Sequence, residues 1–225
     1  MLNQGNIEIN QLNRDFYSKN NESFDKSRKD NFWKGFENVK KYLKDGQRIL
    51  DLGCGNGRFL EFLIKNNSNF NYLGVDNSVD FIAKDTQKYP SYKFLELDLV
   101  SNLDQITNKY DLVIVFGVTH HIPSYEYRKE WFQKLEGILA SEGILVLSFW
   151  EFNSDKADKE FKPEKYQVEK NDFFLGWKGD FLCHRYCHLF DQEEIEEIKK
   201  ILSNLRVLEE YSLDDNRYLI LKKER

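Results

Sequence analysis

The segment QRILDLGCGNGRFLEFLIKN (Gln47–Asn66) decides the fold of this chain. Its first part, QRILDLG, is an apolar run that predicts a buried strand, and RFLEFLIKN predicts an amphipathic helix. Between them stand Gly53, Gly55 and Gly57, spaced G-x-G-x-G. Glycines at a strand-to-helix turn let the backbone turn sharply and approach a ligand closely. The segment therefore predicts a strand, a ligand-binding loop and a helix.

The alternation of strands and helices continues downstream of this unit. Helices are expected at Ser78–Tyr89 and Ser124–Ala140. Further strands are expected at Asn71–Asn77, Tyr92–Leu99, Tyr110–Gly117 and Gly143–Phe152. Strands that alternate with helices predict an α/β protein with a parallel sheet that is covered on both faces.

The C-terminal part breaks this alternation. A helix is expected at Asp191–Asn204, followed by strands at Arg206–Leu213 and Arg217–Glu224. The three residues between these strands are too few for a parallel crossover, so the strands should form an antiparallel hairpin. The expected fold is a doubly wound, Rossmann-like α/β sheet that ends in this hairpin.

We expect residues 1–225 to form a single domain with two additions to the sheet. Residues 153–190 are rich in aromatic and charged residues without clean periodicity, and such a long irregular stretch is typical of a functional insertion on the substrate side. Residues 1–44 should form a partly helical cap, in which apolar residues recur at helical spacing: Phe32, Phe36, Val39, Tyr42 and Leu43.

The composition is that of a folded soluble protein. Lys and Arg total 33, Asp and Glu total 38, and the net charge of −5 excludes a protein that coats nucleic acid by bulk charge. No apolar run approaches the roughly 20 residues of a membrane span, and the N-terminus resembles no targeting peptide. The three cysteines give no disulfide framework. A cytoplasmic protein without membrane contact is expected.

Acidic residues mark the ends of three successive predicted strands. Asp51 precedes the first loop glycine by two positions, where a carboxylate would repel a pyrophosphate but favour an ammonium group. Asp76 stands where an acidic residue can accept both ribose hydroxyls of an adenosine. Asp98-Leu99 suits the adenine amino group. Adenine, ribose and a cationic amino-acid tail without phosphate describe S-adenosylmethionine.

Two other interpretations of the glycine loop are weaker. A tight turn that binds nothing would not explain why Asp51, Asp76 and Asp98 all stand at strand ends. A nicotinamide or flavin site would favour the spacing G-x-G-x-x-G, which this loop lacks.

The motifs LDLGCGNG (Leu50–Gly57), GVDNS (Gly74–Ser78) and LELDL (Leu95–Leu99) resemble those of class I S-adenosylmethionine-dependent methyltransferases. The resemblance covers about residues 45–152 and the closing hairpin, and it implies a seven-stranded sheet. It implies that the cofactor is bound by Asp51, Gly53, Cys54, Gly55, Asn56, Gly57, Asp76, Asn77, Asp98, Leu99, Phe116 and Gly117.

A narrower resemblance is carried by Val115–Trp131, Ser148–Phe152 and HRYCHLF (His184–Phe190). These segments are similar to tRNA methyltransferases that esterify 5-carboxymethyluridine at the wobble position, although Cys187 stands where that family has Tyr. That family also carries a pattern of aromatic residues and an Arg before the glycine loop, and a similar pattern occurs in this chain. The resemblance implies tRNA and an activator subunit as partners, and the catalytic residues His121, Arg185 and His188. The residues of the pattern are Tyr17, Phe24, Arg28 and Trp33.

The acceptor remains open at this point. A carboxylate needs no general base, only a positive partner, for which Arg28, Arg185 and His188 are candidates. A small-molecule metabolite is the alternative to tRNA, since the insertion is less basic than an RNA-binding face. A non-catalytic subunit that keeps the cofactor pocket but lacks an acceptor channel is a further alternative.

The cluster Cys183-His184-x-x-Cys187-His188 contains four groups that could bind a metal. If this segment is a strand, both cysteines face one side and both histidines the other, because side chains alternate along a strand. One tetrahedral zinc site is therefore awkward, and no metal is expected.

Overall fold

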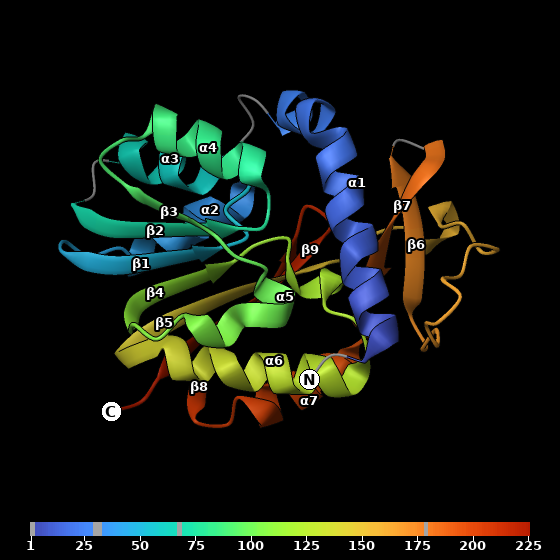
Figure 1. The fold of residues 1–225 in the computed structure, drawn as a ribbon. Helices are drawn as coiled ribbons and strands as arrows, with labels where there is room; N and C mark the ends of the chain where they lie inside the picture. The colour runs from blue at the N-terminus through green and yellow to red at the C-terminus, as the bar shows by residue number, and fades with distance from the viewer. Residues whose placement is uncertain (1–2, 29–32, 67–68, 178–179) are drawn as a thin grey trace.

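The computed structural model describes residues 3–28, 33–66, 69–177 and 180–225 (Figure 1). Its helices are α1 (Gln4–Arg28), α2 (Lys34–Val39), α3 (Arg58–Lys65), α4 (Val79–Lys88), α5 (Leu99–Asn102), α6 (Tyr125–Ile138) and α7 (Gln192–Ile201). Its strands are β1 (Gln47–Leu52), β2 (Phe70–Asp76), β3 (Lys93–Glu96), β4 (Tyr110–Val115), β5 (Leu139–Trp150), β6 (Asp172–Trp177), β7 (Asp180–His188), β8 (Leu205–Leu213) and β9 (Asn216–Lys223).

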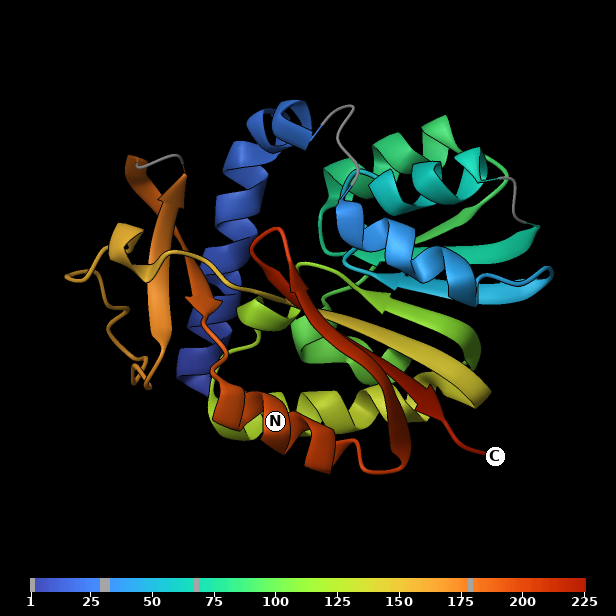
Figure 2. The same ribbon diagram turned by 180° about the vertical axis from the view of Figure 1, so that it is seen from behind.

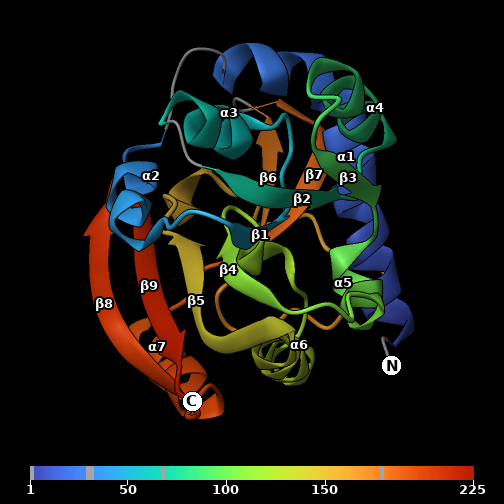
Figure 3. The same cartoon turned by 90° about the vertical axis from the view of Figure 1, so that its left-hand side faces the viewer.

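The main sheet has seven strands in the order β3-β2-β1-β4-β5-β9-β8. Strands β1 to β5 are parallel, and β9 lies antiparallel to both β5 and β8. Helices α2, α3 and α4 cover one face, and α5, α6 and α7 cover the other (Figure 3). The predicted fold class is confirmed, including the antiparallel hairpin at the C-terminus.

Side-chain alternation along the central strands builds two cores. In β1, Ile49 packs on the α2–α3 side, where Phe62 is buried, while Leu50 packs on the α5–α7 side with Trp131. All these side chains are at most 1% exposed. Because both faces of the sheet are covered, its strands are nearly continuous apolar runs, as expected for buried parallel strands.

The turn between β8 and β9 consists of two residues with left-handed backbone angles. Asp214 has a φ of 50° and Asp215 a φ of 56°. Positive φ at both central residues is the geometry that a two-residue hairpin needs to match the twist of its strands. This turn makes β9 antiparallel to β8. It also brings Asp214 and Asp215 to the border of a cavity at the carboxyl ends of β1, β2 and β4.

Residues 153–190 contain more regular structure than their sequence predicts. β6 and β7 form a separate two-stranded antiparallel sheet, so the expectation of an irregular segment was wrong for residues 172–188. At the end of β7 both faces are buried, with Tyr186 and His188 on one face and Cys187 on the other, and this removes the simple apolar–polar alternation. Helix α1 lies between this small sheet and the main sheet (Figures 1 and 2).

The first residues of the chain form one long helix and one short helix. Of the apolar residues predicted to recur before β1, Phe36 and Val39 are buried in α2, and Phe32 lies outside the described residues. Within the described part of the chain, no helix is both long and apolar enough to cross a membrane.

Gly35 on α2 packs directly against the buried ring of Tyr218 on β9. A Cβ at this position would lie 2.4 Å from Cζ of Tyr218, whereas a Cβ at Gly137 on α6 would meet no atom within 4 Å. We expect Gly35→Ala to lower the free energy of unfolding by about 1–3 kcal/mol through overpacking. Gly137→Ala should leave it unchanged or raise it by about 0.4–1 kcal/mol. Urea unfolding of both variants measures this difference, and equal stability of the two would show that α2 does not dock on β9 in this way.

Candidate active site

A cavity of about 440 Å³ lies at the carboxyl ends of β1, β2 and β4. This is the edge at which open parallel sheets bind their ligands. The predicted cofactor residues that border it are Asp51, Gly53, Cys54, Gly55, Asn56, Asp76, Asn77, Asp98, Leu99, Phe116 and Gly117. Gly57 does not border it. This glycine precedes α3 at the N-cap position, close to Asp85.

The glycine loop is shaped by its backbone angles and by its contact with β2. Gly53 has a φ of 79° and Gly55 a φ of 54°, which favour glycine at both positions. The Gly53 amide donates to the Val75 carbonyl at 2.7 Å. A Cβ on Gly55 would have no atom within 4 Å. The loop therefore leaves open space next to its backbone, where a ligand can approach closely.

Asp51 places a buried carboxylate at the end of β1. Asp51 is only 3% exposed, and the Tyr72 hydroxyl donates to its Oδ2 at 2.8 Å. Burial raises the pKa of Asp51 to about 7, although the bond from Tyr72 acts in the opposite direction. A positively charged group in the cavity would favour the ionised carboxylate.

Asp76 is held between two loops at the end of β2. Its Oδ2 accepts the Gly55 amide and its Oδ1 accepts the Ser78 amide, both at 2.9 Å. Burial raises the pKa of Asp76, while the bonds from backbone amides oppose this shift. A carboxylate offers about four acceptor positions, and the backbone amides of Gly55, Ser78 and Asn77 do not use all of them. Asp76 is therefore oriented by the protein and can still accept hydrogen bonds from a ligand.

Asp98 borders the cavity but is saturated by bonds within the protein. Its Oδ1 accepts the amides of Val100 and Ser101, and its Oδ2 accepts Asn10 Nδ2 and Ser101 Oγ. A carboxylate offers about four acceptor positions, and these four bonds use them. We therefore propose that Asp98 positions α1 and Leu99, rather than accepting the adenine amino group as the sequence suggested.

The donor half of the cavity fits S-adenosylmethionine. Two oriented carboxylates, Asp51 and Asp76, flank the open side of the glycine loop, and this arrangement would repel a phosphate but suits an ammonium group and a ribose. Aromatic side chains complete the wall and can face a flat base or a sulfonium cation. The aromatic residues that border the cavity are Tyr17, Phe24, Trp33, Phe36, Phe59, Phe81, Phe116, Trp150 and Tyr218.

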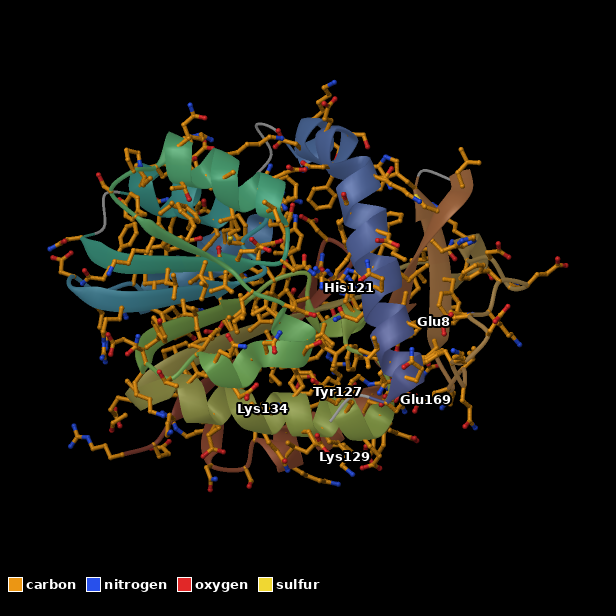
Figure 4. All side chains as sticks on the ribbon, in the orientation of Figure 1. Glu8, His121, Tyr127, Lys129, Lys134 and Glu169 are labelled. Atoms are coloured by element: carbon orange, nitrogen blue, oxygen red, sulfur yellow. The ribbon has the colours of Figure 1, made fainter. Side chains whose placement is uncertain are left out.

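His121 lies at the other half of the cavity, beside α1 (Figure 4). Its Nδ1 is 2.8 Å from the Tyr186 carbonyl oxygen and its Nε2 is 2.8 Å from the Tyr17 hydroxyl. Because a carbonyl can only accept, Nδ1 carries the proton and Nε2 accepts from Tyr17. Burial, together with the nearby Arg185, lowers the pKa of His121 to about 3. His121 is therefore a neutral imidazole and a poor base.

Arg185 lies next to His121 in an aromatic enclosure. Its guanidinium carbon is 5.0 Å from the ring centre of Phe16, 4.9 Å from that of Trp150 and 5.9 Å from that of Trp177. Its Nη1 donates to the Tyr17 hydroxyl at 3.4 Å, and its Nε is buried without a hydrogen-bond partner. Among the described residues, no carboxylate forms an ion pair with Arg185, and none is among the groups that shift the pKa of Arg185. The cavity thus contains a cation that suits an anionic ligand.

His188 does not join His121 and Arg185. It is fully buried on the opposite face of β7, where Nδ1 lies 2.7 Å from Asp172 Oδ1 and Nε2 lies 2.9 Å from both carboxylate oxygens of Glu194. The strand alternation that separates positions 185 and 188 places it there. We therefore no longer propose His188 as a residue that contacts the acceptor. The side chain of Arg28, the third predicted cation, lies outside the described residues.

We assign no metal to the histidine and cysteine residues near the cavity. His184 and His188 bond to Asp158 and Asp172 on one face of β7, away from Cys187. Ligand atoms of His120, His121 and Cys187 do lie within 4.8 Å of one another. However, both ring nitrogens of His121 are already hydrogen-bonded, and the charge of Arg185 acts on the same ring.

Helix α1 contributes polar residues to the cavity that sequence reasoning missed. Asn10 bonds to Asp98, and Asn13 Oδ1 accepts the amide of Tyr186 at 2.7 Å. The available signal was the recurrence of asparagine at helical spacing, at Asn6, Asn10 and Asn13. Tyr17 and Phe24, which are part of the aromatic and Arg pattern in the sequence, border the same cavity.

Comparisons with known proteins place this chain among methyltransferases. A protein-family model described as "Methyltransferase domain" matches residues 50–145. A protein of Encephalitozoon cuniculi that is named as a methyltransferase is 26% identical over 209 residues, which cover 92% of this chain and 93% of that protein. The solved structure of Burkholderia thailandensis 1,6-didemethyltoxoflavin-N1-methyltransferase, which contains S-adenosylhomocysteine, has a TM-score of 0.70 at 11% identity. That match covers 100% of this chain and 93% of the other.

Two further relatives differ in their named substrates. Trans-aconitate 2-methyltransferase of Rhodopseudomonas palustris is 28% identical over 106 residues, which cover 47% of this chain and 40% of that protein. A mouse protein named tRNA methyltransferase 9B is 26% identical over 155 residues, which cover 68% of this chain and 31% of that protein. This chain thus spans less than half the length of either relative.

We predict that Asp76→Ala weakens the binding of S-adenosylhomocysteine roughly ten- to a hundredfold. Loss of a hydrogen bond to a charged group costs about 1.5–3 kcal/mol, and the variant also releases the Gly55 amide. Calorimetric titration of parent and variant measures the effect, with NAD as the ligand that should not bind to either. Unchanged affinity in the variant would remove Asp76 from the cofactor site.

We also predict that the affinity for S-adenosylmethionine rises with pH through about 7. Without ligand the pKa of Asp51 is about 7. Below that pH the Asp51 carboxyl group must lose its proton before it can pair with the ammonium group of the ligand. If only the ionised carboxylate binds, affinity should be roughly tenfold weaker at pH 6 than at pH 7.5. Calorimetry across this range tests it, and Asp51→Asn should bind weakly at every pH. A slope that persists in Asp51→Asn would assign the proton to another group, such as Asp85.

Proposed function

We propose that this chain, an S-adenosylmethionine-dependent methyltransferase with the class I fold, esterifies a carboxylate. One observation carries the proposal: Arg185 presents a cation to the cavity without a carboxylate partner among the described residues. A buried, unpaired charge is costly, and a bound anion would relieve that cost. The aromatic enclosure of the guanidinium by Phe16 and Trp150 keeps it in one place.

The protonation states in the cavity support an acceptor that is already ionised. S-adenosylmethionine supplies an activated methyl group on a positively charged sulfur. An amine or hydroxyl acceptor would have to lose a proton, and His121 is unsuited to take it because burial and Arg185 oppose its charged form. A carboxylate has a pKa of about 4 and needs no base at neutral pH. The remaining tasks of the protein are to orient the carboxylate and to exclude water.

Tyr17 supports this orientation from α1. Its hydroxyl donates to His121 Nε2 and accepts from Arg185 Nη1, so it connects the two residues on the acceptor side. An acceptor carboxylate that bonds to Arg185 would lie next to this hydroxyl. The catalytic role that we propose for Arg185 is to hold the carboxylate, while Tyr17, which is itself bonded to His121, holds Arg185.

The acceptor that we favour is 5-carboxymethyluridine in a tRNA anticodon. The motif resemblance at His184–Phe190 and the similarity to the mouse tRNA methyltransferase 9B support it. A base in an anticodon loop can be taken between aromatic and Arg side chains, and Trp150, Trp177 and Arg185 offer such surfaces. An activator subunit with a basic surface would compensate for the net charge of −5.

A small carboxylic acid is the second candidate. The acidic overall charge favours it, because the chain attracts phosphates weakly. The relative named for trans-aconitate shows that similar sequences occur among enzymes named for small acids. A non-catalytic binding subunit is not supported, since the cavity extends from the donor half to Arg185.

We predict that Arg185→Met lowers methyl transfer on the order of 30-fold or more and leaves affinity for S-adenosylhomocysteine within about twofold. Truncation of one partner of a buried charge pair costs about 2–5 kcal/mol. Labelled methyl transfer into total tRNA and into a small-metabolite extract, each across a salt series, measures the loss. Transfer into tRNA should fall steeply with salt, and transfer into a small acid should not.

The outcomes test the carboxylate proposal and the tRNA acceptor separately. Base-labile label, as expected of a methyl ester, supports a carboxylate in either fraction. Base-stable label, or full transfer by Arg185→Met, would refute the carboxylate proposal. No label in tRNA, with candidate partner subunits present, would refute the tRNA acceptor alone.

A further inference from the structure

Strand β7 separates two polar environments. Arg185 on one face borders the main cavity. Tyr186 and His188 on the other face point into a group of buried charges that the proposed reaction does not use. Both Tyr186 and His188 are 0% exposed. The residues that carry these charges come from several elements. Contacts on both faces of β7 therefore fix its position.

His188 is held between two carboxylates. Asp172 Oδ1 lies 2.7 Å from its Nδ1, and both Glu194 oxygens lie 2.9 Å from its Nε2. Ionised carboxylates only accept hydrogen bonds, so both ring nitrogens must carry a proton. Burial disfavours the charged ring, but the bonds to Asp172 and Glu194 outweigh it, and the pKa of His188 is raised above its ordinary value.

The other charged groups around His188 complete what we call the buried ion cluster. Arg128 Nη2 donates to Glu169 at 3.3 Å and to Glu194 at 3.4 Å. The Tyr166 hydroxyl donates to Asp172 Oδ2 at 2.5 Å. The cluster consists of Tyr166 and Glu169 from the segment before β6, Asp172 of β6, Arg128 of α6, Glu194 of α7, and Tyr186 and His188 of β7. It pairs two cations with three carboxylates, so loss of the His188 proton leaves Arg128 as its one cation.

Tyr186 connects this cluster to the acceptor side of the cavity. Its hydroxyl donates to Asp172 Oδ1 at 2.7 Å and accepts from Arg128 Nη1 at 3.1 Å. Its backbone carbonyl accepts the Nδ1 proton of His121 at 2.8 Å. Arg185 is the preceding residue of the same strand. A shift of Tyr186 toward or away from Asp172 therefore changes the bond that fixes the His121 ring.

We propose that His188 is a positioning residue that acts across β7, and that its proton holds His121 and Arg185 in their places in the cavity. When His188 loses its proton, one ring nitrogen presents a lone pair to a carboxylate, and the contact between β7 and α7 or β6 weakens. Tyr186 then moves with β7, and the bond from His121 to its carbonyl weakens too. The inference rests on the proposed function only where it identifies Arg185 as the group that binds the acceptor.

The chain has only four histidines, so the coupling can be measured directly. We would record ring nitrogen spectra of ¹⁵N-histidine-labelled full chain, without any ligand, from pH 5 to pH 10. His188 should keep both ring protons at the pH where an ordinary histidine loses one, and should lose one only at a higher pH. His121 should be a neutral Nδ1–H ring below that transition, and its ring signals should shift at the same pH at which His188 titrates.

Two variants on β7 make the test specific. His188→Gln should abolish the alkaline transition of His121. His184→Gln should keep it, because His184 bonds to Asp158 on the same face of the strand but outside the cluster. The coupling would be overturned if His121 ring signals ignored the titration of His188, or if His188→Gln left the His121 transition in place. Should His188→Gln fail to fold, the parent titration alone still decides between these results.

Methyl transfer to the acceptor is a separate measurement. If the His121 signals shift as His188 titrates but Arg185→Met transfers methyl groups normally, the positioning role stands and the carboxylate proposal fails. If the His121 signals do not respond to His188 while Arg185→Met is inactive, the carboxylate proposal stands and the positioning role fails.

Discussion

The hydrogen bonds of α1 join the small sheet of β6 and β7 to the main sheet and its helices, around the cavity. Amide side chains on α1 bond to four separate elements: Asn6 to Ser124 before α6, Asn10 to Asp98 before α5, Asn13 to the Tyr186 amide on β7, and Asn21 to Asp80 on α4. Asp25 adds a bond to Asn56 in the glycine loop. Each of these hydrogen bonds is costly to break, since a buried amide that loses its partner does not regain a bond to water. The position of α1, and with it the shape of the cavity, therefore depends on these contacts.

The cavity that α1 closes has opposite charges at its two ends. Asp51 and Asp76 give the glycine-loop end two carboxylates, and Arg185 gives the other end a cation. A cationic donor and an anionic acceptor would each meet a complementary group, and the neutral His121 lies beside Arg185. Under the proposed function, this division of charge would orient both reactants without a proton transfer, which suits a reaction whose methyl donor is already activated.

Local patterns in the sequence were sufficient for the main sheet and for most of the residues that border the glycine-loop end of the cavity. The apolar runs before Gly53 and Asp76 and the short link between the last two strands predicted the parallel strands and the closing hairpin. Asp51, Asp76 and the loop glycines were placed because parallel strands bring their carboxyl ends to one edge of the sheet. These inferences needed only side-chain periodicity and loop length, which neighbouring residues determine.

The sequence by itself determined the class I fold, the cofactor edge and the choice of Arg185 and His121 as candidates. Only the tertiary structure decided that His188 faces away from the cavity, that Asp98 is saturated by Asn10 and the α5 amides, and that residues 172–188 form a second sheet. The physical reason is that the partners lie on separate elements: strand alternation puts His188 opposite Arg185, but Asp172 of β6 and Glu194 of α7 meet it only in the folded chain. The partners of His188 come from β6 and α7, and those of Asp98 include a residue 88 positions away. Packing of separate elements sets such pairs, and no local pattern encodes them.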